Sequence, residues 1–162
     1  QGIVNALTGQ FLNSVMRRGK FLVFDIGGGG LHIVINPKLT GRLQLAQPSD
    51  KRMAKTHLIL RLANDIELRY IDQRQMGQVY LTRNLDAVPD FAGMGPEPFD
   101  LNLEQFRARL KPFRGEIKGV LTRSDFIAGI GKEYHGLGRG FQSKRRRLTF
   151  DPLERSAEFI GL

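Results

Sequence analysis

Short apolar and alternating runs dominate the first half of the chain. They lie at residues 21–26, 31–36, 42–46, 58–62, 67–72 and 78–81, and each has the length and composition of a β-strand. Residues 27–30 and 64–65 provide turn chemistry between them. Several short strands at this spacing are typical of an antiparallel sandwich or barrel rather than of a parallel sheet.

The second half has apolar positions at helical spacing. Leu103, Phe106 and Leu110 follow an i, i+3, i+7 pattern, and Ile117 begins a second segment of the same period. Asp151 before a proline predicts another helix start near the end. Residues 93–98 contain two glycines and two prolines, which interrupt regular structure. We therefore predict an α+β fold, with an antiparallel β-sandwich at residues 1–92, a linker at 93–100 and a helical domain at 101–162.

Composition and charge narrow the function classes. The chain has 162 residues, of which 41% are hydrophobic, so it can bury a sizeable core. Its 25 lysines and arginines exceed its 16 acids, giving a net charge of +9, which favours nucleic acid as a partner ahead of an acidic membrane surface. No apolar run approaches the ~18 residues of a membrane span, and no signal sequence is recognisable, so we expect a soluble, intracellular protein. The absence of cysteine excludes disulfides and thiolate metal sites within these residues.

The basic residues recur in four separate groups. A single group of this kind is usually a solvated face, but four groups with too few acids to balance them favour a phosphate-binding surface. The groups are Arg17, Arg18 and Lys20; Lys51, Arg52 and Lys55; Lys111, Arg114 and Lys118; and the run at residues 144–147.

Other candidate motifs are better explained by structure than by chemistry. The glycines at residues 27–30 lack a following Gly-Lys-Ser/Thr and indicate a hairpin turn instead of a phosphate loop. Residues 136–140 lack the spacing and preceding strand of a dinucleotide fingerprint. The histidines His32, His57 and His135 are scattered singly, so we predict no metal site.

Two segments have patterns that suit DNA. The turn at residues 128–131, followed by Lys132, can bind a phosphate through its backbone amides, and it can equally serve as the glycine-rich turn of an αα-hairpin. Arg74 and Met76 lie two residues apart after the strand at 67–72. A long cation and a flexible apolar side chain on one exposed loop suit a protein that fills the hole left by an extruded base.

Five ordered motifs resemble those of the formamidopyrimidine-DNA glycosylase and endonuclease VIII family. They are Arg-Arg-Gly-Lys-Phe-Leu-Val-Phe at 17–24, Leu-Thr-Gly-Arg-Leu at 39–43, Glu-Leu-Arg-Tyr-Ile-Asp at 67–72 with Arg74 and Gly77, Gly-Pro-Glu-Pro at 95–98, and Ile-Ala-Gly-Ile-Gly at 127–131. The resemblance covers roughly residues 7–160. It implies an N-terminal antiparallel β-sandwich followed by a helix-two-turn-helix domain, and then usually a zinc or zincless finger.

The resemblance also implies DNA-binding positions. They are Lys20, Asn36, Leu39, Arg74, Gln75, Met76, Gly129, Gly131 and Lys132. Lys20 corresponds to the backbone-phosphate lysine, and Leu39 takes the place of an intercalating methionine. Arg74 and Met76 correspond to the arginine and phenylalanine of the other void-filling loop. Asn36 replaces a histidine, Gln75 a second arginine and Lys132 a phosphate-binding asparagine.

Catalysis in the family depends on an N-terminal proline amine, which attacks the C1′ atom of the damaged nucleotide, and on a neighbouring glutamate. The chain starts at Gln1, downstream of both, and ends at Leu162, before any finger. We therefore expect a partial chain with no catalytic residue of its own, no metal site and no cofactor; zinc would enter only with a following finger.

The function that the resemblance implies for the intact protein is base excision repair. It would be a DNA glycosylase with abasic-site lyase activity on oxidised bases, acting on damaged double-stranded DNA, as a monomer in the bacterial cytoplasm at the nucleoid and without a membrane. A non-catalytic damage-sensing or architectural DNA-binding protein of the same fold is the alternative. An RNA-associated protein would share the basic charge but does not require Arg74 and Met76.

Overall fold

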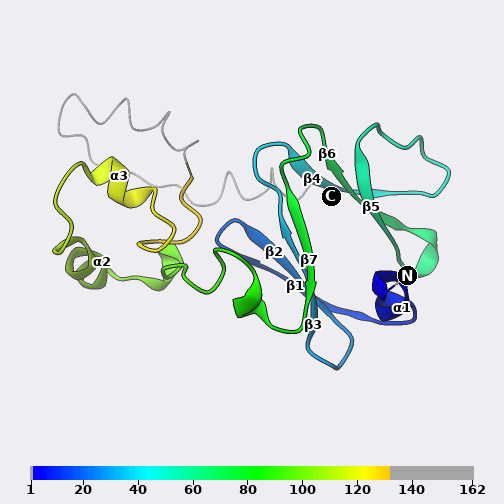
Figure 1. The fold of residues 1–162 in the computed structure, drawn as a ribbon, viewed down its shortest axis with the longest axis horizontal. Helices are drawn as coiled ribbons and strands as arrows, with labels where there is room; N and C mark the ends of the chain where they lie inside the picture. Colours follow the sequence, from blue (N-terminus) through cyan, green and yellow to red (C-terminus); the bar gives the residue numbers. More distant parts are fainter. Residues whose placement is uncertain (1, 132–162) are drawn as a thin grey trace.

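The computed structural model describes residues 2–131. Seven strands and three α-helices form in this part of the chain, with the strands in the first half and two of the helices in the second (Figure 1). The elements are α1 Gly2–Leu7, β1 Leu12–Arg18, β2 Phe21–Ile26, β3 Leu31–Asn36, β4 Gly41–Ala46, β5 Thr56–Arg61, β6 Glu67–Asp72, β7 Gln78–Thr82, α2 Leu103–Leu110 and α3 Ile117–Leu121.

The strands form two antiparallel sheets. One sheet has the order β1-β2-β3-β7, and the other has the order β4-β6-β5. Phe24, Ile33 and Ile35 of the first sheet pack with Tyr70 of the second in one buried cluster. Burial of these apolar faces is the main driving force for stacking the sheets. The predicted α+β fold, which begins with an antiparallel sandwich, is confirmed.

Strands β2 and β3 are buried on both faces, which explains their continuous apolar character. Their outer face carries Phe21, Val23 and Val34, which pack against Val88. The segment that contains Val88 follows β7, and Phe91 meets Phe21 edge-on with ring centroids 5.4 Å apart. The chain therefore crosses the outer face of the first sheet before it enters the linker.

The helical half has a small core of its own. Asn102 caps α2: its side chain accepts from the Gln105 amide, and the Gln105 side chain accepts from the Asn102 amide, both at 2.9 Å. Phe126 is 1% exposed and lies edge-on to Phe106 and Phe113, with centroid distances of 5.7 and 5.3 Å. These aromatic contacts hold α2 against the turn at residues 124–131.

The expected and observed elements agree closely, with two exceptions. All six predicted strands form, with ends displaced by at most two residues, and both predicted helical segments appear as α2 and α3. Strand β1 and helix α1 were not expected, and Arg17 and Arg18 form the end of β1. The predicted helix start at Asp151, the basic run at 144–147, and His135 and Lys132 lie outside the described residues.

Candidate nucleic-acid interface

Strand register brings three loops to one end of the sandwich. Arg18 pairs with Phe21 around the β1–β2 turn, and Asn36, at the end of β3, pairs with Gln78, at the start of β7. Because β2 and β3 are antiparallel neighbours, with Leu22 opposite Ile35, the β1–β2 turn lies beside the end of β3. The loop at residues 37–40 and the loop at residues 73–77 leave from this same end (Figure 1).

The two loops present apolar side chains to solvent. Leu39 is 60% exposed in the loop at 37–40, and Met76 is 49% exposed in the loop at 73–77, where Arg74 is also exposed. All three side chains therefore lie outside the core of the sandwich, as an inserting role requires. Large apolar side chains that are exposed together on neighbouring loops are typical of an interaction surface.

Asp72 holds the two loops together. Its side chain is 1% exposed; one carboxylate oxygen accepts a short hydrogen bond from the Thr40 hydroxyl and another, at 3.2 Å, from the Arg74 amide. The other oxygen accepts from the Gly77 amide at 2.6 Å, and the Arg74 amide also donates to the Thr40 hydroxyl at 3.1 Å. The Thr40 hydrogen bond, followed by the Gly77 amide, holds the pKa of Asp72 below its ordinary value despite burial.

Glycines 41 and 77 are required by the close approach of Tyr70. A Cβ atom at either position would overlap with the Tyr70 hydroxyl, and at Gly77 it would also lie 3.0 Å from Oδ2 of Asp72. Both loops are thus packed on the same buried tyrosine. Next to it, His57, Tyr70, Asp72 and Gln75 line a cavity of about 230 Å³.

Two loop residues take left-handed backbone conformations. Lys38 has φ 51° and Gln75 has φ 56°, a region that non-glycine residues rarely occupy. The side chain of Asn36, which is 5% exposed, accepts a hydrogen bond from the Lys38 amide at 3.3 Å. Asn36 therefore supports the loop from below, whereas Gln75 is exposed at its tip.

Lys20 lies beside the glycine turn of the helical half. It is exposed in the β1–β2 turn, and a Cβ atom at Gly131 would lie 3.3 Å from its Cε and 3.4 Å from its Nζ. A Cβ at Gly129, whose φ is +81°, would lie 3.0 Å from a guanidinium nitrogen of Arg17. The absence of side chains at both positions lets the turn approach the basic β1–β2 turn, so that a lysine amine and two glycines share one surface.

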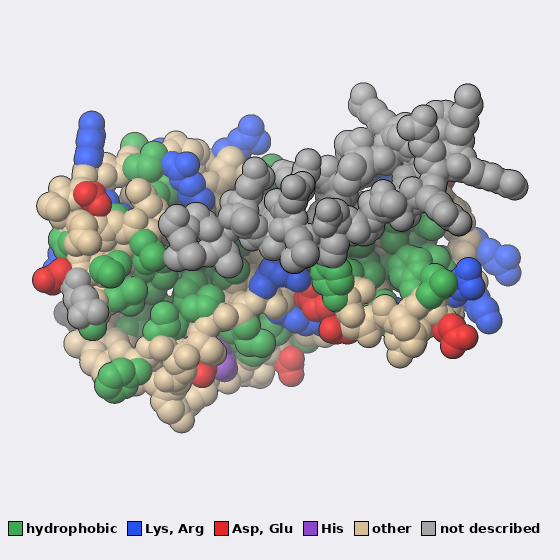
Figure 2. All heavy atoms as spheres, turned by 180° about the vertical axis from the view of Figure 1, so that it is seen from behind, with side chains coloured by type: hydrophobic (Ala, Val, Ile, Leu, Met, Phe, Trp, Pro, Cys, Tyr) green, Lys and Arg blue, Asp and Glu red, His purple; other side chains and the backbone are tan. Residues whose placement is uncertain are grey.

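Several basic side chains from the predicted phosphate-binding groups form ion pairs within the protein. Arg17 and Arg18 form ion pairs with Glu97 at 2.9 and 3.2 Å. Figure 2 shows basic and acidic side chains side by side near the middle of the face opposite that of Figure 1. Arg52 lies 3.6 Å from buried Glu67. The sequence offered no signal for these pairs, because the partners are far apart along the chain.

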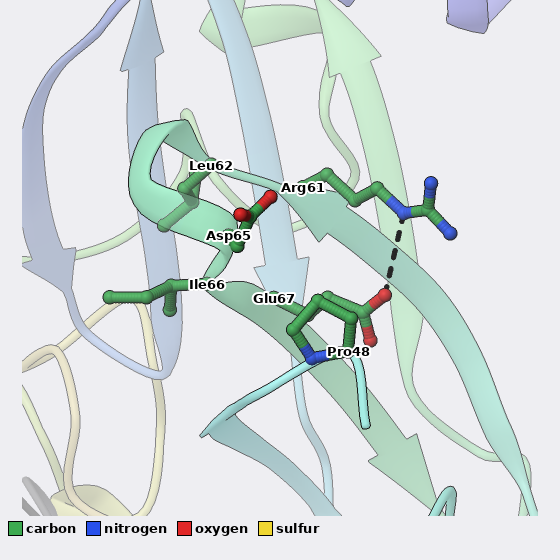
Figure 3. A pocket seen from close by; sticks show the side chains of 6 residues that line it. All are labelled: Pro48, Arg61, Leu62, Asp65, Ile66 and Glu67. Atoms are coloured by element: carbon green, nitrogen blue, oxygen red, sulfur yellow. Dashed lines mark ion pairs between the residues drawn. The ribbon is translucent and has the colours of Figure 1, made fainter. Parts of the chain in front are cut away.

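A second charged centre lies at the other end of β6. Glu67 is fully buried, and Arg69 donates to it at 2.8 Å, while Arg61 approaches the same carboxylate at 3.4 Å. The Arg69 hydrogen bond leads the interactions that lower the pKa of Glu67 against burial. Figure 3 shows the ion pair between Arg61, at the end of β5, and Glu67, at the start of the neighbouring β6. The pair lies at the edge of a cavity of about 180 Å³, which Pro48, Leu62, Asp65 and Ile66 also line.

Comparison with known proteins identifies the family. Residues 1–79 match the family model of the formamidopyrimidine-DNA glycosylase N-terminal domain. The chain is 36% identical over 129 residues to the formamidopyrimidine-DNA glycosylase of Desulforamulus reducens, and 37% identical over 128 residues to that of Solibacter usitatus. The alignments span 77% and 79% of this chain and 46% of each relative. This chain belongs to the formamidopyrimidine-DNA glycosylase family.

Solved structures of the family have the same fold. MutM in complex with DNA containing carbocyclic 8-oxo-G superposes with a TM-score of 0.71 at 29% identity, covering 83% of this chain and 52% of that one. The Lactococcus lactis formamidopyrimidine-DNA glycosylase bound to abasic-site DNA superposes with a TM-score of 0.72 at 30% identity, covering 82% of this chain and 51% of that one. The chain thus spans about half the length of these members of the formamidopyrimidine-DNA glycosylase family.

Two further findings concern residues 2–131 alone. None of their helices is long and apolar enough to cross a membrane. Nor do these residues gather three or more histidine or acidic side chains in a group that could hold a metal ion.

Proposed function

We propose that the protein carrying this chain is a base excision repair DNA glycosylase with abasic-site lyase activity on oxidised bases in duplex DNA. The residues described here bind and distort the duplex. The attack on the sugar would come from the N-terminal proline amine that the family resemblance implies. Support comes from relatives named as glycosylases and from the MutM and Lactococcus lactis structures, which contain 8-oxo-G and abasic-site DNA.

The observation that carries the proposal is the pair of loops tied by Asp72. Leu39 and Met76 project from them, with Arg74 beside Met76, and each is exposed in the protein alone. Extrusion of a base costs a few kcal/mol, and less for a damaged pair. Full burial of one apolar side chain of this size returns about 1.5–3 kcal/mol, so two such side chains inserted into the stack offset much of that cost.

Phosphate binding would hold the duplex while these side chains enter it. Lys20 provides the cation, and the amides of Gly129 and Gly131 provide neutral donors beside it. Lys132 completes this proposed set, although it lies outside the described residues. We propose that the protein acts as a monomer on nucleoid DNA in the bacterial cytoplasm, and that it needs zinc only if a finger follows.

A comparison of two duplexes tests the inserting role. Arg74→Ala combined with Met76→Ala should weaken binding to an abasic-site duplex at least tenfold and binding to the intact duplex far less, because only the former offers a void to fill. Leu45→Ala is the control, since Leu45 is 55% exposed near the opposite end of β4. Equal losses on both duplexes would remove the inserting role.

Borohydride trapping tests the chemistry. The full-length protein should form a covalent adduct with abasic-site DNA, because reduction captures a Schiff base between an amine and C1′. A protein that prefers abasic sites but gives no adduct would instead be a damage-sensing or architectural DNA-binding protein of the same fold.

A further inference from the structure

Glu97 is the point at which the linker meets the sandwich. Its side chain is 17% exposed and lies against the β1–β2 turn. One carboxylate oxygen accepts from Arg17 at 2.9 Å, and the other accepts from Arg18 at 3.2 Å and from the Gly19 amide at 2.5 Å. Glu97 thus contacts three consecutive residues that are far from it in the sequence.

The linker residues before Glu97 contact residues 124–128, which lead into the glycine turn at residues 128–131. The Gly95 amide donates to the Ser124 carbonyl at 2.8 Å, and the Ala128 amide donates to the Pro96 carbonyl at 2.9 Å. Gly95 is buried, and a Cβ there would lie 2.6 Å from the backbone of Phe126. One short linker segment is therefore bonded to the segment at residues 124–128, while Glu97 grips the β1–β2 turn.

These contacts determine where Lys20 lies. Lys20 follows Gly19, which Glu97 holds through its amide, and the Lys20 amine lies beside Gly131 at the end of the glycine turn. We propose that Glu97 is a positioning residue, which fixes the β1–β2 turn against the glycine turn so that Lys20 and the glycine amides form one phosphate-binding site. This inference rests on the proposed function, because it assigns a role to the same phosphate contacts.

The charge of Glu97 fits this role. Burial alone would raise its pKa, but the Gly19 amide and the two guanidinium groups outweigh burial and keep the pKa below the ordinary value. Glu97 is therefore an anion at neutral pH. An anion beside a phosphate would repel it, so Glu97 contributes through the groups that it holds rather than by touching the DNA.

A double-mutant cycle in the full-length protein tests the role. The variants are Lys20→Ala, Glu97→Gln and their combination, and the readout is the slope of log affinity against log salt for an abasic-site duplex. Loss of one phosphate contact lowers the magnitude of that slope by about one unit, which reduces the affinity lost between 50 and 200 mM salt by about fourfold. Glu97→Gln should reproduce most of this change, and the combination should equal Lys20→Ala alone.

The controls separate positioning from general stability. Glu116→Gln changes an exposed carboxylate for which the described residues provide no ion pair, and it should leave the slope unchanged. If Glu97→Gln lowers the melting temperature, Arg18→Gln replaces it in the same double-mutant cycle with Lys20→Ala, because Arg18 is the other partner of the contact. Fully additive effects of Lys20 and Glu97 would overturn the positioning role alone. An unchanged slope in Lys20→Ala would overturn both this role and the proposed phosphate contact.

Discussion

Strand β6 buries a carboxylate at each end, and the two carboxylates have different partners. Glu67 begins the strand and is held by arginine side chains, whereas Asp72 ends it and is held by a hydroxyl and by backbone amides of the next loop. They lie five residue steps apart along the strand, which is about 17 Å. Arg69 of the same strand and Arg61 of β5 both hold Glu67, so that end serves the fold. The amide partners of Asp72 shape a loop, so the Asp72 end serves the candidate interface.

The largest expected effect lies at the Glu67 end. Arg69→Met leaves the buried Glu67 without its nearest cation and removes hydrogen bonds to the carbonyls of Gln47 and Asp50, so the melting temperature should fall by roughly 10 °C. Arg61→Met is the matched change, because Arg61 is 75% exposed, and it should cost only about 1–2 °C. Thermal unfolding followed by circular dichroism compares the two. Equal falls in melting temperature would mean that the buried pair of Arg69 and Glu67 contributes no more to stability than the exposed pair of Arg61 and Glu67.

Acid should weaken both ends of β6, because folding lowers the pKa of both carboxylates. The pKa of Asp72 is lowered below its ordinary 3.8, so its contribution to stability is present above about pH 4 and is lost as the pH falls through the native value. The pKa of Glu67 is also lowered in the folded protein, so its contribution to stability is likewise lost as the pH falls. The melting temperature should therefore stay level from about pH 7 to pH 5 and fall below about pH 4.

The variants Asp72→Asn and Glu67→Gln sharpen this comparison. Each variant should reduce the fall of the melting temperature below about pH 4, since each removes a carboxylate whose pKa is lowered by folding. At neutral pH, Asp72→Asn should also reduce the preference for abasic-site over intact duplex, while Glu67→Gln should retain it. Melting temperature against pH, together with binding to both duplexes, gives the result. A retained preference in Asp72→Asn would contradict the role of Asp72 in the loops.

The smallest effect on stability should come from the loop side chains. Leu39 is 60% exposed, so Leu39→Ala should change the melting temperature by less than about 2 °C. The same substitution should lower affinity for the abasic-site duplex several-fold, because the inserted apolar area is lost. Calorimetry and binding on one preparation measure both quantities. A large fall in the melting temperature would mean that Leu39 stabilises the fold, as Glu67 does.

The sequence predicted the strands wherever burial leaves a pattern. Strands β2 and β3 are mainly apolar because both of their faces are buried, and β6 carries Leu68, Tyr70 and Ile71 between its charged ends. The bounds of all three strands were predicted without error. Strand β1 is an edge strand whose side chains are exposed on both faces, including Val15 and Met16. Neither face selects apolar residues, so no alternation marked this strand.

The candidate site was only partly accessible to sequence reasoning. The loop positions of Leu39, Arg74 and Met76 follow from strand ends and motif order, and the structure places all three in exposed loops. The assignment of these three residues, and of the other candidate positions, to DNA binding stays a prediction. The roles of Asp72 and Glu97 depend on contacts between distant segments, which local patterns do not encode.

Asp72 binds the loop at residues 73–77 through its backbone amides and not through its side chains. The amides of Arg74 and Gly77 donate to it, but neither the Arg74 guanidinium nor the Met76 thioether is among the bonds that the described residues make to this carboxylate. The side chains at residues 74 and 76 can therefore be exchanged without loss of these backbone hydrogen bonds. Under the proposed function, substitutions at Arg74 and Met76 are expected to change which damaged duplex is preferred without breaking the hydrogen bonds of Asp72.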